Sequence, residues 1–307
     1  MKPIKIQNVT KSYGTEEAVK GISFEVDEGE LFGLIGPDGA GKTTIFRILT
    51  TLLTPDKGEA FVLAKDVVED YRNIRSRVGY MPGRFSLYQD LSVQENVEFF
   101  ASVFGTTVET NYDLIKPIYR QLEPFKDRLA GALSGGMKQK LALSCALIHK
   151  PEVLFLDEPT TGVDAVSRKE FWEMLHRLKE QDITILVSTP YMDEAEQCDR
   201  IALIQQGNIL SIDTPEHTTN SFDSRLWAIK SNNKYQLLKR LNEYKYAESV
   251  QPFGEYVHYT DQRVDAKSSD LKTYLESQQI SSPEVKEIEP DIEDTFMRLM
   301  EQEDNDG

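Results

Sequence analysis

Hydrophobic residues recur along the first part of the chain at two different spacings. Alternate positions are apolar at residues 4–6 and 22–26, which predicts two half-buried antiparallel strands joined by a turn near Tyr13. A continuous apolar run at residues 31–35 predicts a buried strand, and the apolar residues from Ile45 onward, Leu52 included, follow helical spacing. The order strand, glycine-rich loop, helix is therefore predicted here.

Similar patterns further along predict a parallel α/β core with a helical insertion. An all-apolar run at residues 153–156 is typical of a buried parallel strand, a third strand is expected at 183–188, and a helical pattern lies between them. Ser92, followed three positions later by Glu95, forms a capping box at the start of a helix. We expect a first domain over residues 1–220, with the helical insertion at about 84–150.

The apolar pattern changes beyond that domain and predicts a small α+β domain over residues 225–300. Its expected elements are a strand at 227–230, a helix at 237–244, a hairpin across 250–259, a helix at 271–275, a strand at 285–288 and a helix at 292–300. Residues 301–307 are expected to form an acidic tail, because ten acidic and two basic residues lie from Ile280 to the end.

Composition and charge exclude several classes of function. The net charge of -16 would repel a polyanion, so no nucleic-acid partner is expected. No apolar run approaches the roughly 20 residues that a membrane helix needs, and the first ten residues do not form a secretion signal. Cys145 and Cys198 lack metal-ligand spacing, which favours a reducing, cytoplasmic location.

The glycine-rich loop matches the phosphate-loop pattern. Its backbone amides must point inward at phosphate oxygens, and glycine allows the chain to curl that tightly. Lys42 would reach the β- and γ-phosphates, and the Thr43 hydroxyl would bind Mg²⁺. The predicted ATP-binding residues of this loop are Gly36, Pro37, Asp38, Gly39, Ala40, Gly41, Lys42, Thr43 and Thr44.

Two carboxylates, Asp157 and Glu158, follow the apolar run at residues 153–156. Ligands of open α/β sheets collect at the carboxyl ends of the strands. Asp157 is therefore predicted to hold hydrated Mg²⁺, together with Thr43. Glu158 is predicted to be the catalytic residue that polarises the water attacking the γ-phosphate.

The segment LSGGMKQ at residues 133–139, placed between the phosphate loop and Asp157, resembles the signature of ATP-binding cassette (ABC) proteins. Over about residues 2–215, the chain is similar to the nucleotide-binding subunit of an ABC transporter. The resemblance implies an α/β fold of the P-loop NTPase, ABC type: a parallel-sheet core, an antiparallel β subdomain and a helical insertion. It also implies an ATPase that uses ATP and Mg²⁺ and pairs head to tail with a second ATP-binding subunit.

The same resemblance assigns roles to residues outside the phosphate loop. The signature residues Ser134, Gly135, Gly136 and Gln139 would act on the nucleotide held by the partner, because a helix start binds anions. Asp164 would link the two sites across the dimer, although an Asp before a helix is also an ordinary N-cap. Tyr13 would stack on adenine, although it is also an ordinary turn residue.

Membrane permeases are the other partners that the resemblance implies. The insertion would form a groove for a short permease helix, with some of its aromatic rings facing that helix. The aromatic residues of this segment are Phe85, Tyr88, Phe99, Phe100 and Phe104. We expect a peripheral protein on the cytoplasmic face of the membrane, in an export-type system. The second domain resembles accessory segments of exporting members, with a role in dimer support or regulation.

Three positions depart from the family pattern. Gly83 stands where the family has a glutamine, and Pro190 stands where it has a histidine that donates to the γ-phosphate. Asp38 replaces the usual Asn of the phosphate loop. Losing one preorganised donor lowers a rate by roughly 10²–10³-fold. These departures put turnover at the chain's own site in question.

Several interpretations stay open on the sequence alone. The chain forms either a heteromer, with a slow site of its own beside a competent partner site, or a homodimer whose two weakened sites still turn over. A non-hydrolysing regulatory subunit is another reading. A soluble ABC protein acting on ribosomes or DNA is disfavoured by the charge of -16 and by the single cassette.

Overall fold

The computed structural model describes residues 2–306 of the chain, and their side chains as far as residue 302. The chain divides into two compact units, Met1–Pro215 and Glu216–Gly307. The first unit contains a six-stranded sheet, a four-stranded antiparallel sheet and most of the helices. The second unit contains a four-stranded antiparallel sheet with helices on both faces.

The six-stranded sheet of the first unit has the order β10-β9-β3-β8-β7-β6, and all strands except β10 run parallel. Its strands are β3 (Leu31–Ile35), β6 (Val78–Met81), β7 (Val153–Asp157), β8 (Thr184–Thr189), β9 (Arg200–Gln205) and β10 (Asn208–Asp213). Every residue of β3, β7 and β8 is buried, as the short, mostly apolar runs predict. Because these strands are parallel, the segments that follow them meet at one edge of the sheet.

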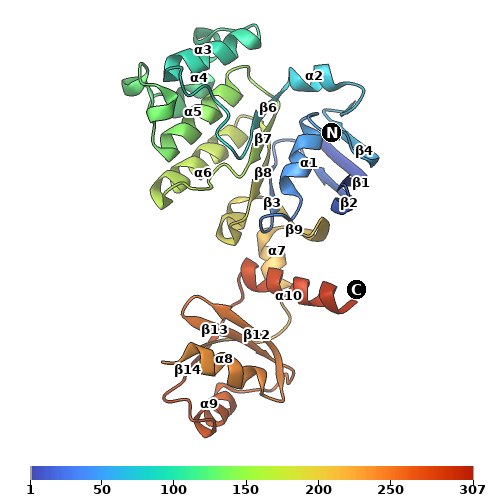
Figure 1. Cartoon of the computed structure of the whole chain (residues 1–307), viewed down its shortest axis with the longest axis vertical. Coiled ribbons are helices and arrows are strands. Elements are labelled where there is room, and N and C mark those ends of the chain that lie inside the picture. The colour runs from blue at the N-terminus through green and yellow to red at the C-terminus, as the bar shows by residue number, and fades with distance from the viewer. Residues whose placement is uncertain (1, 307) are drawn as a thin grey trace. The chain divides into compact units, whose positions relative to one another are not determined.

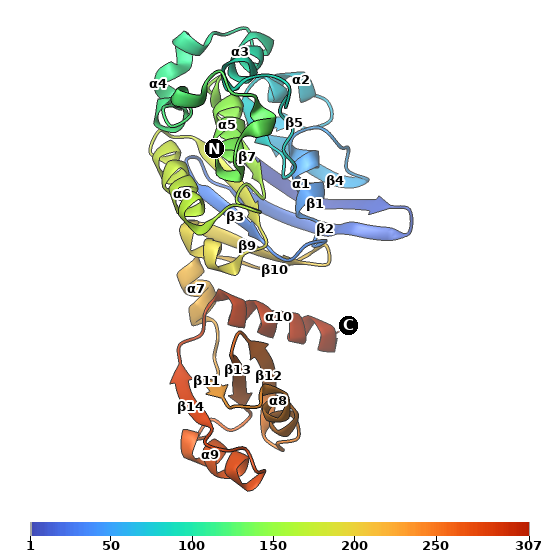
Figure 2. The ribbon, with the colours of Figure 1, turned by 60° about the vertical axis from the view of Figure 1, so that its left-hand side comes forward.

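The antiparallel sheet of the first unit has the order β2-β1-β4-β5. Its strands are β1 (Ile4–Tyr13), β2 (Glu16–Val26), β4 (Lys57–Val62) and β5 (Lys65–Asp66). Strands β1 and β2 form a long hairpin that is seen side-on in Figure 2. Helix α1 (Lys42–Leu49) shares one apolar core with both sheets. The helix ends before Leu52, which is 58% exposed, so the predicted extension to that residue was wrong.

The remaining helices of the first unit include the predicted helical insertion. They are α2 (Tyr71–Arg75), α3 (Val93–Val103), α4 (Val108–Tyr119), α5 (Gly135–Leu147) and α6 (Ala165–Lys179), with short 3₁₀ turns at Glu123–Phe125, Ala130–Ala132 and Met192–Gln197. Helices α3, α4 and α5 gather in one group in Figure 1. The capping box at Ser92 and Glu95 is present and begins α3, as predicted.

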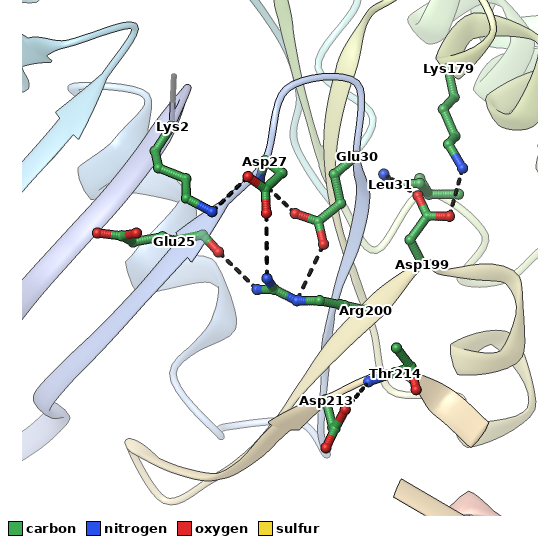
Figure 3. Close-up of polar contacts among 10 residues, drawn as sticks. All are labelled: Lys2, Glu25, Asp27, Glu30, Leu31, Lys179, Asp199, Arg200, Asp213 and Thr214. Atoms are coloured by element: carbon green, nitrogen blue, oxygen red, sulfur yellow. Dashed lines mark hydrogen bonds and ion pairs between the residues drawn. The ribbon is translucent and has the colours of Figure 1, made fainter. Parts of the chain in front are cut away.

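An ion cluster ties the start of β3 to its neighbours, and Figure 3 shows it. Arg200 on β9 lies with its Nε 3.3 Å from Oε1 of Glu30, and its Nη2 donates to the backbone oxygen of Glu25. Asp27 lies 3.7 Å from Nη1 of Arg200 and also pairs with Lys2. Burial raises the pKa of Glu30. This cluster braces the amino end of β3, the end opposite to the glycine-rich loop.

The second unit has the strand order β12-β13-β11-β14. Its elements are β11 (Leu226–Lys230), α8 (Lys234–Asn242), β12 (Ala247–Phe253), β13 (Tyr256–Asp261), α9 (Ser268–Ser277), β14 (Glu284–Ile288) and α10 (Ile292–Asp306). Helices α8 and α9 pack their leucines on Trp227 and Tyr259, while α10 lines the other face beside His258. Each predicted element is present, but the last helix continues to Asp306 instead of ending at residue 300. A further helix, α7 (Pro215–Asn220), has a proline as its first residue, a position that proline favours.

Candidate functional site

The glycine-rich loop connects the carboxyl end of β3 to the first turn of α1. Gly41 precedes the helix with a φ of 102°, a backbone conformation that disfavours side chains. A Cβ atom at Gly41 would lie 2.4 Å from the backbone oxygen of Ala18, and one at Gly36 would lie 2.1 Å from that of Ile204. The loop therefore packs directly against the backbone of β2 and β9, and its shape requires glycine at both positions.

Lys42 is the first residue of α1, and its side chain is only 3% exposed. Its Nζ donates to the backbone oxygens of Gly36 at 2.7 Å and Pro37 at 3.0 Å, and it lies 3.2 Å from Oε1 of Glu158. Among the side chains that the structure describes, none caps the start of α1, and the first turn of this helix carries no acidic residue. A buried ammonium group at a helix start suits an anion such as a phosphate.

Asp157 and Glu158 lie at the end of β7, and Ser188 on the neighbouring strand β8 holds both. The Ser188 hydroxyl donates to Oδ1 of Asp157 at 2.7 Å, and the Glu158 amide donates to the Ser188 hydroxyl oxygen at 3.0 Å. Asp157 is 2% exposed, and Glu158 has a φ of 51° that turns the chain sharply. Sequence reasoning assigned Ser188 no role, although its place at the end of a parallel strand beside Asp157 could have indicated one.

The residues available for Mg²⁺ fit that ion. The Asp157 carboxylate and the Thr43 hydroxyl are hard oxygen donors, as Mg²⁺ prefers. Among the described residues, no group of three or more His, Cys, Asp or Glu side chains is arranged so that it could hold a metal ion. Such a sparse donor set suits Mg²⁺, because this ion is usually held by one or two carboxylates together with substrate phosphates and water.

Two of the three departures from the family pattern also lie at this edge of the sheet. A Cβ atom at Gly83 would lie 3.1 Å from the Asp157 backbone oxygen and 3.7 Å from Cβ of Glu158. Pro190 directly follows Thr189, the last residue of β8. Gly83 therefore borders the residues that carry the carboxylates, Pro190 lies two residues after Ser188, and neither residue supplies a side-chain donor.

The signature segment begins α5 beside the loop that follows Glu158. Ser134 is the N-cap of this helix, and its hydroxyl oxygen accepts from the Met137 amide at 3.4 Å. A Cβ atom at Gly136 would lie 2.6 Å from Oγ of Ser167, so α5 and the start of α6 approach closely there. Ser134 and Gly135 are exposed, while Gln139 is half-buried.

Two other predicted site residues lie outside the phosphate loop. Asp164 is the N-cap of α6 and accepts from the amides of Val166 at 3.1 Å and Ser167 at 3.0 Å, bonds that lower its pKa. Tyr13 ends β1 and is 47% exposed. Among the described residues, no hydrogen bond joins Ser134 or Asp164 to the phosphate loop. The site therefore consists of one closely bonded group around Lys42 and outlying residues that stand apart from it.

A groove of about 390 Å³ lies between the sheet and the helical insertion. Its rim carries two strongly exposed apolar residues, Leu52 at 58% and Val103 at 59%. Some of the five aromatic residues of this segment were predicted to face such a groove, and Phe100 and Phe104 line it.

The other three aromatic residues of this segment make contacts of their own. Tyr88 and Phe99 pack edge to face at 4.8 Å, and the Lys138 ammonium lies 5.5 Å from the ring centre of Phe85. None of these three lines the groove. No helix in the described part of the chain has the length and apolar character needed to cross a membrane.

Comparison with known proteins places this geometry in a family. Residues 19–161 match the ABC transporter family. Over 216 residues the chain is 42% identical to the Nod factor export ATP-binding protein I of Burkholderia lata. The aligned region makes up 69% of this chain and 71% of that protein. The chain belongs to the family of ABC transporter ATP-binding proteins. The predicted family and fold class are thereby confirmed.

Two further relatives show how far this similarity extends. The chain is 41% identical over 215 residues to the probable multidrug ABC transporter ATP-binding protein YbhF of Escherichia coli, covering 69% of this chain but only 37% of that protein's length. A dimeric ATP-binding cassette, solved in a post-hydrolysis state with ADP and phosphate, superposes with a TM-score of 0.63 at 26% identity. That comparison covers 69% of this chain and 98% of the cassette.

Proposed function

We propose that this chain is the ATP-binding subunit of an export-type transporter, in which ATP binding and hydrolysis drive separate membrane permeases. The observation that carries the proposal is the buried Lys42 ammonium, set at a helix start 3.2 Å from Glu158. The helix start and the ammonium group attract a polyphosphate, and the carboxylate is placed to act on a water beside it. The names of the relatives, which are export and multidrug proteins, support the direction.

In the proposed cycle, the amides of residues 39–44 and the Lys42 ammonium hold the triphosphate. Thr43 and Asp157 would hold Mg²⁺, which supplies neutralising charge at the phosphates when it is bound. Glu158 orients the attacking water and accepts its proton, with its own backbone fixed by Ser188. Tyr13 stacks on the adenine ring.

The second half of each site comes from a partner ATP-binding subunit. Ser134, Gly135, Gly136 and Gln139 of this chain face the nucleotide of the partner, and Asp164 lies at the junction between the two sites. Support comes from the exposure of Ser134 at a helix start, and from the dimeric state of the solved relative.

The chain's own site is proposed to turn over slowly within a heteromer. Gly83 borders Asp157 and Glu158, Pro190 follows the end of β8, and neither supplies a side-chain donor. Each lost donor lowers a rate by roughly 10²–10³-fold. The partner site would then supply most of the hydrolysis. The same two residues favour one second candidate, a regulatory subunit that binds ATP without turnover.

The groove between the sheet and the helical insertion is proposed to receive a short helix of the permease at the cytoplasmic face of the membrane. Its exposed Leu52 and Val103 would be covered by an apolar face of that helix.

Binding to membranes that contain the permease tests the proposed function. The variants Leu52→Glu and Val103→Glu should reduce sedimentation with membranes of the source cells at least tenfold and leave ATP binding unchanged. The control Val264→Glu changes a residue that is 91% exposed in the second unit and should sediment like the parent chain. Equal sedimentation of all three variants would contradict the permease assignment.

A further inference from the structure

Glu194 is a buried carboxylate behind the candidate site, in the 3₁₀ turn Met192–Gln197, and it is 4% exposed. Its Oε2 accepts from the hydroxyl of Thr189 at 2.5 Å and from that of Thr160 at 2.9 Å. Both threonines are almost fully buried, at 0% and 1% exposure. One carboxylate oxygen therefore joins two segments that come from neighbouring strands.

Each of these segments carries a residue of the candidate site. Thr160 lies in the turn that begins at Glu158, and the Thr161 amide donates to the Glu158 backbone oxygen at 3.3 Å. Thr189 ends β8, directly after Ser188, which holds Asp157 and the Glu158 amide. Glu158 is therefore fixed from one side by Ser188, while the turn that follows it is fixed by Glu194 through Thr160.

A role in stability alone does not account for a carboxylate at this place. Burying a carboxylate is costly unless its oxygens are satisfied, and an apolar residue of similar volume is often equally stable. The other oxygen of Glu194, Oε1, has no hydrogen-bond partner in the described part of the chain, and Nη1 of Arg168 is 3.9 Å away. What the carboxylate does provide is a rigid link of defined length between Thr160 and Thr189.

We infer that Glu194 is a positioning residue, which keeps the turn from Glu158 to Thr161 and the loop leading to Asp164 in register with the end of β8. The inference rests on the proposed ATP hydrolysis, because it concerns the placement of Glu158. In this chain, Pro190 supplies no side-chain donor at the same point. The link through Glu194 is then a main constraint on the position of the Glu158 carboxylate, which is proposed to act on water. A shift of about 1 Å at such a group can lower the rate roughly 100-fold.

The test removes one hydroxyl of the link and compares it with a matched hydroxyl outside it. Thr160→Val deletes a donor to Glu194 without changing the shape of the side chain. Thr184→Val is the control, because Thr184 is equally buried at 1% and its hydroxyl bonds to the Gly29 amide at the other end of β8. For both variants, hydrogen exchange, the affinity for Mg-ATP, and hydrolysis of ATP by excess enzyme are measured on the full chain.

The inference predicts a local and kinetic effect. In Thr160→Val, exchange at the amides of Glu158 and Thr161 should rise about tenfold, the hydrolysis rate constant should fall about tenfold, and ATP affinity should stay within twofold. Thr184→Val should leave those two amides and the rate unchanged. Thr189→Val, which removes the second donor, should behave like Thr160→Val.

Four results would overturn the inference. Unchanged hydrogen exchange at the amides of Glu158 and Thr161 would show that the hydroxyl of Thr160 does not hold this turn in place. An increase in exchange spread evenly over the chain would show that the hydroxyl has a purely structural role. An unchanged rate, or no hydrolysis by the parent chain over a day, would leave no catalytic geometry for Glu194 to support. Failure of the parent chain to bind ATP would instead refute the proposed function, while exchange in the nucleotide-free chain would still test the link.

Discussion

Lys42 Nζ and Glu158 Oε1 lie 3.2 Å apart at the start of α1, with the lysine almost fully buried. The ammonium group also bonds to two backbone oxygens of its own loop. A triphosphate in the loop would compete with these backbone oxygens for the ammonium group, because a polyanion attracts the ammonium more strongly than neutral carbonyl oxygens do. In the proposed function, nucleotide binding is thereby coupled to the position of Glu158, the residue proposed to act on water.

Removing this ammonium should weaken nucleotide binding. A hydrogen bond to a charged group contributes about 1.5–3 kcal/mol, so Lys42→Ala should raise the dissociation constant for ATP roughly 10- to 100-fold. Equilibrium dialysis with labelled ATP measures this change. Lys57→Ala, at an exposed lysine on β4, should bind like the parent chain. Equal affinities for Lys42→Ala and the parent would show that the phosphates lie elsewhere.

The signature segment should act on the partner and not on the chain's own nucleotide. Ser134→Arg places a large cation at the exposed start of α5, where it would block the approach of a neighbouring subunit's phosphates. ATP binding should remain within twofold of the parent, while ATPase activity of a mixture with the partner ATP-binding subunit should fall at least tenfold. Ser277→Arg, on α9 of the second unit, serves as the control. Loss of ATP binding in Ser134→Arg, to the extent seen in Lys42→Ala, would contradict this division of labour.

Restoring the glutamine should speed the chain's own site. In Gly83→Gln the new amide would enter beside Asp157 and Glu158, although its Cβ must displace the Asp157 backbone slightly from a contact of 3.1 Å. Adding Pro190→His should restore the second donor. We expect hydrolysis by the lone chain to rise at least tenfold in the double variant, as phosphate-release assays would detect. Rapid ATP hydrolysis by the parent chain alone would contradict the proposal that its own site is slow.

Acid should destabilise the groove through His149. This histidine lines the groove, and burial lowers its pKa from the usual value of 6.5. Its ring stacks on Phe104 at 3.7 Å, and its Nδ1 is buried without a hydrogen-bond partner among the described residues. Because the folded-state pKa lies below the unfolded one, the stabilisation is present above about pH 6.5 and is lost as the pH falls through the folded-state pKa. The melting temperature should therefore fall between pH 7.5 and 5.5.

The control for this pH effect is His149→Phe, which keeps a stacking ring and removes the titrating group. Its melting temperature should depend less on pH over the same range, as scanning calorimetry would show. Identical pH profiles for the two chains would mean that His149 does not contribute to acid sensitivity.

Much of the site could be predicted from sequence because its chemistry is local. The residues from Gly36 to Thr44 form the phosphate loop within one strand-loop-helix segment, and Asp157 and Glu158 sit at the end of one apolar run. In these segments, residue type and spacing alone define the geometry. The elements of the second unit were predictable for the same reason, since each is short and has its own apolar pattern.

The contacts between segments could not be predicted in the same way. The bonds of Ser188 to Asp157 and of Glu194 to Thr160 depend on the register of β7 against β8, which no local pattern encodes. The ammonium of Lys42 bonds to Gly36 and Glu158 because the loop folds back on itself. Leu52 continues the helical spacing in the sequence, but the helix ends at Leu49, and Leu52 lines the groove instead.

The most direct test of the central claim is a calorimetric titration of the purified full chain with Mg-ATP. The account predicts saturable binding with one nucleotide per chain, and a dissociation constant that rises at least tenfold in Lys42→Ala. No heat of binding at any ATP concentration, confirmed by dialysis, would contradict it.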